Sequence, residues 1–133
     1  MFVAYYLPLL IWMGIIFYFS SKKGSGYPMK TWQFYMERKG AHIAEYFLLA
    51  VLFLRIFFLG RFDWISRQKK YLPYASAFVF SFIFAVSDEF HQYFIFGREG
   101  KISDIGIDVI GIILALLAYW IAMKQKVIHR NKD

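Results

Sequence analysis

Cysteine is absent from this chain of 133 residues, which excludes disulfide bonds, thiolate metal sites and cysteine nucleophiles. The chain also lacks a Gly-x-Ser-x-Gly turn, a glycine loop that cradles phosphate, and the His-Glu-x-x-His pair of metal ligands. It contains no internal repeat, low-complexity tract or long linker, so we expect a single domain over residues 1–133. Common enzyme signatures are therefore missing, and the distribution of charge becomes the most informative feature.

Charge is scarce over four long stretches of the chain. Residues 1–21 carry no charged side chain, and hydrophobic residues make up 59% of the whole sequence. A helix needs about 20 mainly apolar residues to cross a bilayer, and none of the stretches alternates as a membrane β-strand does. Because lipid cannot satisfy unpaired backbone groups, helices are the expected spanning elements. We therefore predict an all-α, integral membrane four-helix bundle with spans at about 2–21, 41–59, 71–90 and 105–123.

The first stretch differs from a cleaved signal peptide. It has no basic residue before its apolar run and no Ala-x-Ala type of cleavage site, because Phe19-Ser20-Ser21 is followed at once by Lys22-Lys23. We expect it to be retained as a membrane helix.

The net charge of +7 could indicate a nucleic-acid partner, but the 16 Lys and Arg residues are dispersed among the connections and the C-terminal tail. In a membrane protein this distribution reports orientation, because cytoplasmic loops are enriched in Lys and Arg. Nine of these residues fall on the side of the two termini, and seven fall on the other side. We expect no nucleic-acid partner, cytoplasmic N- and C-termini, and an extracytoplasmic polar site.

The acids gather on the side away from the termini. Seven of the nine Asp and Glu residues fall in the first and third connections or in the helix ends beside them. Glu45, Asp88 and Asp108 fall within or at the margins of the predicted spans, where an ionised Asp at mid-membrane costs about 2.5 to 3.5 kcal/mol. Such residues face a bundle interior or a polar cavity. The stretch 87–108 is therefore predicted to contribute to a site.

Helical spacing places the polar residues on shared faces, because residues three or four positions apart are neighbours on a helix. The sets with this spacing are Lys39, His42 and Glu45 on the second helix, Asp88 and Gln92 on the third, and Asp104 and Asp108 on the fourth. We predict a one-sided polar pocket that binds its ligand through Arg38, Lys39, His42, Glu45, Tyr46, Asp88, Glu89, Gln92, Arg98, Asp104 and Asp108. The candidates for acid–base catalysis are His42, Glu45, Asp88, Glu89 and Asp108.

Several of these residues also have a purely structural interpretation. His42 could be an internally hydrogen-bonded side chain, Arg98 a solvated loop charge, and Asp104 an N-cap that stabilises the start of the fourth helix. Gly111 and Ala115 have the small-x-x-x-small spacing that lets membrane helices approach closely.

The carboxylates could hold Mg²⁺ or Ca²⁺ through oxygen ligands. Salt bridges to Arg38, Lys39 and Arg98 would satisfy the same groups without an ion. We therefore expect no metal at this cluster and no cofactor.

The combined pattern is more specific than its parts. Its elements are Arg38-Lys39-x-x-His42-x-x-Glu45-Tyr46, Asp88-Glu89-x-x-Gln92, Gly97-Arg98-x-Gly100, Asp104-x-x-x-Asp108-x-x-Gly111 and, in the first helix, "IWMGIIFYFSS". From about residue 9 to residue 118 the chain resembles the VanZ-like family. The resemblance implies a multi-pass membrane protein of the bacterial cell envelope, from a family whose founding member lowers susceptibility to the glycopeptide antibiotic teicoplanin. It implies no molecular mechanism.

Three mechanisms are compatible with these features, and whether the protein is an enzyme stays open among them. In the one we favour, a non-enzymatic protein binds membrane lipids, a lipid-linked cell-wall precursor or a glycopeptide-related ligand, and Arg38, Lys39 and Arg98 hold its phosphate or carboxylate. In the second, a membrane enzyme acts on a lipid-linked or phosphorylated envelope substrate, with His42 or Glu89 as general base. In the third, a homo-oligomer carries ions or protons along intramembrane acids.

Overall fold

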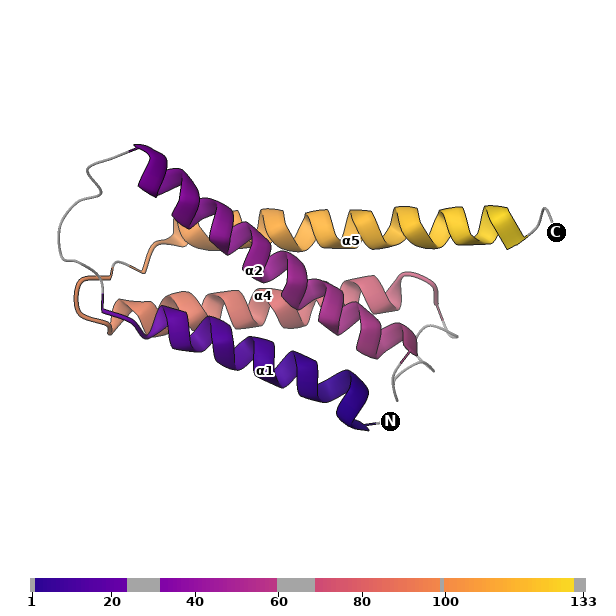
Figure 1. Ribbon diagram of the computed structural model, residues 1–133, viewed down its shortest axis with the longest axis horizontal. Coiled ribbons are helices and arrows are strands. Elements are labelled where there is room, and N and C mark those ends of the chain that lie inside the picture. Colours follow the sequence, from indigo (N-terminus) through magenta and orange to yellow (C-terminus); the bar gives the residue numbers. More distant parts are fainter. Residues whose placement is uncertain (1, 24–31, 60–68, 99, 131–133) are drawn as a thin grey trace.

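Four helices make up the chain, as a computed structural model describes it for residues 2–23, 32–59, 69–98 and 100–130. They are α1 (Phe2–Ser20), α2 (Trp32–Leu59), α4 (Leu72–Tyr93) and α5 (Ile102–Arg130), and these described ranges contain no strand. The helices run alternately up and down, so that α1 and α4 end where α2 and α5 begin (Figure 1). The predicted all-α four-helix bundle is confirmed.

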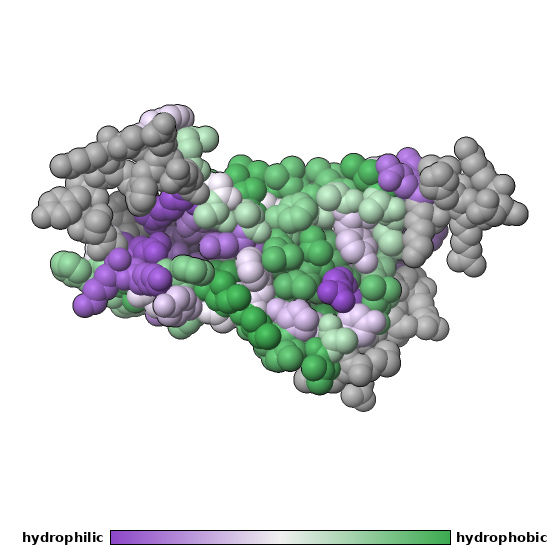
Figure 2. Space-filling model, viewed as in Figure 1, coloured by the Kyte–Doolittle hydropathy of each residue, from purple (hydrophilic) through white to green (hydrophobic). Residues whose placement is uncertain are grey.

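Three of the four helices are long and apolar enough to cross a membrane, through Val3–Ser20 in α1, Arg38–Leu59 in α2 and Ile102–Gln125 in α5. Large apolar side chains on these helices are exposed, among them Leu10 at 58% and Leu117 at 51%. Such exposure is unfavourable in water and favourable in lipid. Figure 2 shows apolar surface over the middle of the bundle, with hydrophilic residues mainly at one end and a few toward the other. The chain is therefore a membrane protein.

The remaining helix, α4, is not among these three. It is 22 residues long and exposes Phe80 and Ile83, but Asp88 and Glu89 lie in its last two turns. These two acids lower the hydropathy of the helix, so its passage through the membrane stays a prediction.

Two helices extend well beyond the apolar runs from which they were predicted. α2 begins at Trp32 and not near residue 41, while α5 continues to Arg130 and does not end near residue 123. Hydropathy marks the part of a helix that suits lipid, whereas the helix itself continues as far as its backbone bonds and residue propensities allow. The connections over 24–31 and 60–68 lie outside the described residues.

The central helix is α2, which packs against α1, α4 and α5. Tyr46 and Leu49 on its inner face are fully buried. Gly111 of α5 lies directly against the α2 backbone, because a Cβ at this position would be 2.4 Å from the carbonyl oxygen of Ile43. Ala115, one turn further along α5, is also fully buried. The small residues of α5 therefore permit the close approach of these two helices, as their spacing predicts.

Gly111→Ala should destabilise the fold by about 1 to 3 kcal/mol, because the new methyl group has no room beside Ile43. Gly106→Ala is the matched control on the same helix, since a Cβ there has no neighbour within 4 Å. The free energy of unfolding of both variants can be measured in detergent by titration with dodecyl sulfate. Equal stability of the two variants would contradict the tight helix contact.

Candidate functional site

Polar side chains are buried at the end of the bundle where α1 and α4 finish and α2 and α5 start (Figure 1). The buried polar residues at this end are Ser20, His42, Asp88, Glu89, Gln92, Asp104 and Asp108. Burying such groups is costly unless each is hydrogen-bonded or paired. The partners that they have, and those that they lack, therefore indicate what this polar cluster can do.

Two polar pairs join α2 to α5. Lys39 Nζ donates to Asp104 Oδ1, and His42 Nδ1 is hydrogen-bonded to Asp108 Oδ1 at 3.0 Å. The partners are three residues apart on α2 and four apart on α5, so each pair lies on the facing sides of the two helices. The side chains of Asp104 and Asp108 are only 4% and 0% exposed, so protein groups must replace their water. The spacing in the sequence predicted these faces, and the structure brings them together.

A hydrogen-bonded network joins α1 to α4. The Ser20 hydroxyl donates to Asp88 Oδ2 at 2.8 Å, and the Gln92 amide donates to the same oxygen at 3.0 Å. Ser21 Oγ lies 3.0 Å from His91 Nε2. The hydrogen-bond donors to Asp88 within the described chain are thus uncharged. Sequence reasoning missed Ser20, Ser21 and His91 as members of the cluster, and the available signal was the Ser-Ser pair that closes an apolar run.

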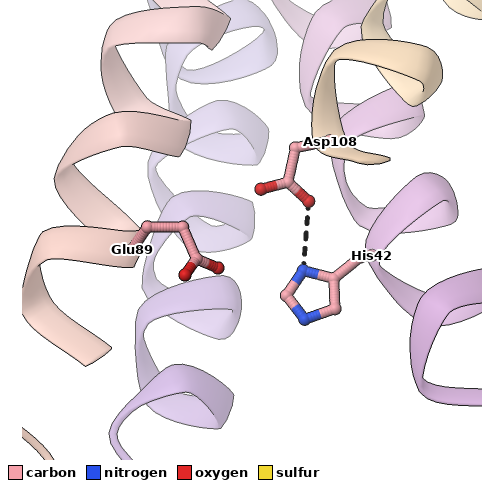
Figure 3. Close-up of side chains that lie close together, drawn as sticks. All are labelled: His42, Glu89 and Asp108. Atoms are coloured by element: carbon pink, nitrogen blue, oxygen red, sulfur yellow. Dashed lines mark hydrogen bonds and ion pairs between the residues drawn. The ribbon is translucent and has the colours of Figure 1, made fainter. Parts of the chain in front are cut away.

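Glu89 is held by one of its oxygens only. The backbone N–H of Lys101 donates to Glu89 Oε2 at 3.0 Å, while Oε1 is buried and accepts no hydrogen bond from the described residues. Figure 3 shows the carboxylate pointing from α4 toward His42 of α2 and Asp108 of α5. One potential ligand atom from each of these three residues lies within 4.8 Å of the other two. Among the described residues, this triplet has the composition and the proximity of a metal site.

Two arginines lie near one another beside the cluster. Arg98 donates from Nη2 to the carbonyl of Phe19 at 2.9 Å and from Nε to the carbonyl of Lys22 at 3.1 Å. Burial, and then repulsion from the Arg38 guanidinium, lower the pKa of Arg98 from its ordinary value. The group nevertheless stays charged at neutral pH, because the ordinary pKa of arginine is above 12. Arg38 is half-buried, and its buried Nε has no hydrogen-bond partner in the described part of the chain.

Glu45 and Tyr46 lie one turn after His42 on α2. Glu45 is half-buried, and its backbone carbonyl accepts a hydrogen bond from Trp12 Nε1 at 3.0 Å. Tyr46 is fully buried in the hydrophobic core, where its ring centroid lies 6.5 Å from that of Phe84. Its hydroxyl has no partner among the described residues. The structure thus places Tyr46 in the core of the bundle, and its role in ligand binding stays a prediction.

A cavity of about 610 Å³ lies at the opposite end of the bundle. It is lined by Phe58, Lys70, Tyr71, Tyr74, Trp120, Met123 and Lys124. None of the predicted ligand-binding residues lines this cavity, so the polar cluster is a separate feature built from packed and mutually paired side chains.

These observations define a class, an all-α membrane protein with paired polar side chains buried at one end of its bundle. The chain belongs to the VanZ/LLP1 family, whose model matches residues 3–123. This match confirms the family that the sequence motifs indicate. No curated protein and no solved structure matches the chain.

Ser20→Ala should destabilise the protein by about 1 to 3 kcal/mol, because it removes one of the two donors to a buried Asp88 oxygen. Ser81→Ala is the matched control, since Ser81 is also fully buried but its hydroxyl has no partner in the described chain. We expect that variant to be neutral or stabilising. Dodecyl sulfate titration of both variants measures the difference, and a loss in Ser81→Ala as large as in Ser20→Ala would be inconsistent with the network.

Proposed function

We propose that this protein is a multi-pass protein of the bacterial cell envelope that binds the anionic group of a membrane lipid or of a cell-wall-related ligand at its polar end. The observation that carries the proposal is the buried Arg38 Nε, which has no hydrogen-bond partner in the described chain and whose guanidinium is close enough to Arg98 for the two charges to repel. Two like charges repel, and burial makes each of them costlier. A phosphate or carboxylate placed between them would relieve both costs.

The guanidinium groups have donors suited to such an anion. Arg38 is half-buried with an unpartnered Nε, and Arg98 has five N–H groups of which the carbonyls of Phe19 and Lys22 engage two. Planar guanidinium donors bind phosphate and carboxylate oxygens in pairs, with shorter and stronger bonds than neutral donors form. This chemistry favours a headgroup ligand over an uncharged one.

The layering of charge at the polar end supports the same ligand. Lys22, Lys23 and Lys101 are exposed, while the acids Asp88 and Asp108 are buried beneath. An approaching anion therefore meets the exposed lysines first. The buried acids attract these cations but do not face the ligand.

We also infer that the polar end is extracytoplasmic and that both termini are cytoplasmic. The support is the distribution of Lys and Arg, of which nine lie on the side of the termini and seven on the side of the polar end. If Arg38 and Arg98 bind a ligand, they no longer report the orientation. The excess of Lys and Arg on the side of the termini is then larger. An extracytoplasmic ligand site is compatible with an effect on teicoplanin susceptibility.

A second candidate function is a membrane enzyme that acts on a lipid-linked or phosphorylated envelope substrate. It is favoured by the buried contact of His42 with Asp108, because a carboxylate that orients an imidazole is a common arrangement for a general base. Glu89 next to this pair would be the alternative base.

Arg38→Gln should weaken the binding of phosphatidylglycerol by about 10- to 150-fold, because a charge-assisted hydrogen bond contributes about 1.5 to 3 kcal/mol. Arg55→Gln is the control, since Arg55 is an exposed arginine of the same helix, more than four turns away. Binding to the purified protein can be measured by native mass spectrometry against phosphatidylcholine. If Arg38→Gln and Arg55→Gln bind phosphatidylglycerol equally well, the arginine pair is not the binding site.

Expression in a teicoplanin-sensitive bacterium should lower its susceptibility, and Arg98→Ala should abolish this protection at equal membrane abundance. If the protein acts by binding an anion, a variant that cannot bind the anion cannot protect the bacterium. Glu89→Gln separates the two candidates, because an enzyme predicts that this variant binds phosphatidylglycerol normally and yet fails to protect. Unchanged protection by Arg98→Ala, measured as the minimal inhibitory concentration, would count against a ligand at the arginine pair.

A further inference from the structure

We propose that His42, Glu89 and Asp108 form a binding site for one divalent transition-metal ion of the Zn²⁺ type. The three residues come from three different helices, α2, α4 and α5, and converge inside the polar cluster (Figure 3). One potential ligand atom of each lies within 4.8 Å of the other two. The inference concerns these three side chains alone and holds whether or not an anion binds at the arginines.

The first argument is that two carboxylate oxygens in this triplet lack partners. Glu89 Oε1 and Asp108 Oδ2 are buried and accept no hydrogen bond from the described residues. Glu89 and Asp108 are 4% and 0% exposed, so bulk water does not satisfy these oxygens. Buried polar atoms in native proteins almost always have a partner, and buried charges are paired or coordinate metals. A cation between the two oxygens would satisfy both of them.

The second argument is that no lysine or arginine forms an ion pair with Glu89 or Asp108 in the described part of the chain. The sequence favoured salt bridges over a metal, on the expectation that Arg38, Lys39 and Arg98 would neutralise the acids. Lys39 is paired with Asp104, however, and Arg98 is directed to the backbone carbonyls at the end of α1. His42 then faces two carboxylates at once, and it supplies at most one positive charge.

The third argument is that the remaining atoms of the triplet are already held in place. Glu89 Oε2 accepts the Lys101 backbone N–H, which leaves Oε1 to coordinate as a single oxygen ligand. The ligand atoms of a tetrahedral Zn²⁺, with bonds of about 2.0 to 2.1 Å, are roughly 3.3 Å apart. The present spacing of up to 4.8 Å exceeds that value, so ion binding requires the three side chains to move closer together.

The ligand set indicates the class of metal. Mg²⁺ and Ca²⁺ prefer oxygen ligands, whereas an imidazole nitrogen suits Zn²⁺ and other first-row transition ions. One His with two carboxylates supplies three protein ligands, which is the number in catalytic zinc sites that keep a further position for water or substrate. A site with an open position at the polar end could accept an oxygen atom of a bound molecule.

The test uses the full chain, purified in detergent, stripped of metal with a chelator and equilibrated with Zn²⁺. We expect one Zn²⁺ per chain by mass spectrometry of the retained metal, with no displacement by excess Mg²⁺ or Ca²⁺. Glu89→Gln and Asp108→Asn should each weaken Zn²⁺ binding by at least roughly tenfold. Asp88→Asn is the matched control, because Asp88 is a buried acid next to Glu89 in the sequence but outside the triplet. It should bind Zn²⁺ as the wild type does.

Folding of each variant is checked by circular dichroism, and a second measurement needs no variant. Wild-type protein loaded with Co²⁺ should show visible absorption bands of an ion with a nitrogen ligand. The proposal is overturned if the folded wild type retains no Zn²⁺, if Co²⁺ shows only the spectrum of the hydrated ion, or if Asp88→Asn loses as much affinity as Glu89→Gln. Phosphatidylglycerol binding by the metal-free protein reports separately on the arginines, so failure of one proposal is distinguishable from failure of the other.

Discussion

The close contact between α2 and α5 is the constraint on which the polar cluster depends. Gly111 brings the backbones of these helices together beside Ile43, which is next to His42 on α2, while Gly111 itself lies three residues from Asp108 on α5. At this separation short acidic side chains of α5 reach Lys39 and His42 across the interface. A larger residue at position 111 would move the helices apart and weaken both pairs together, so packing and electrostatics are not independent in this bundle.

The cost of burying carboxylates explains why the cluster is so densely connected. Each buried acid must gain, from protein groups, interactions that replace its hydration, and in lipid no solvent is available to help. Asp104 obtains a lysine, Asp108 an imidazole, and Asp88 a hydroxyl and an amide. Glu89 obtains a single backbone N–H. Glu89 thus has the fewest hydrogen-bond partners of these acids, and it also faces the pair formed by His42 and Asp108. It is therefore the acid most available to bind or react.

Much of the fold could be predicted from the sequence, because hydropathy and the 3.6-residue period report which segments are helical and which residues share a face. The facing positions of Lys39 with His42 and of Asp104 with Asp108 are examples. The choice of partner could not be predicted, since several acids lie near Arg98 and yet its guanidinium donates to backbone carbonyls. Ser20 and His91 escaped notice because a single serine or histidine near a helix end has no characteristic spacing.

The position of Arg98 has a mechanical consequence for α1. Its guanidinium donates to the carbonyls of Phe19 and Lys22, at the C-terminal end of that helix, where free carbonyl groups carry partial negative charge. Arg98 therefore acts as a cap that comes from the connection between α4 and α5, and it complements the helix dipole of α1. A bound anion would compete with α1 for this same positive group. Occupancy of the polar end and the anchoring of the first helix are thereby coupled, so that a ligand drawing Arg98 outward would loosen the end of α1.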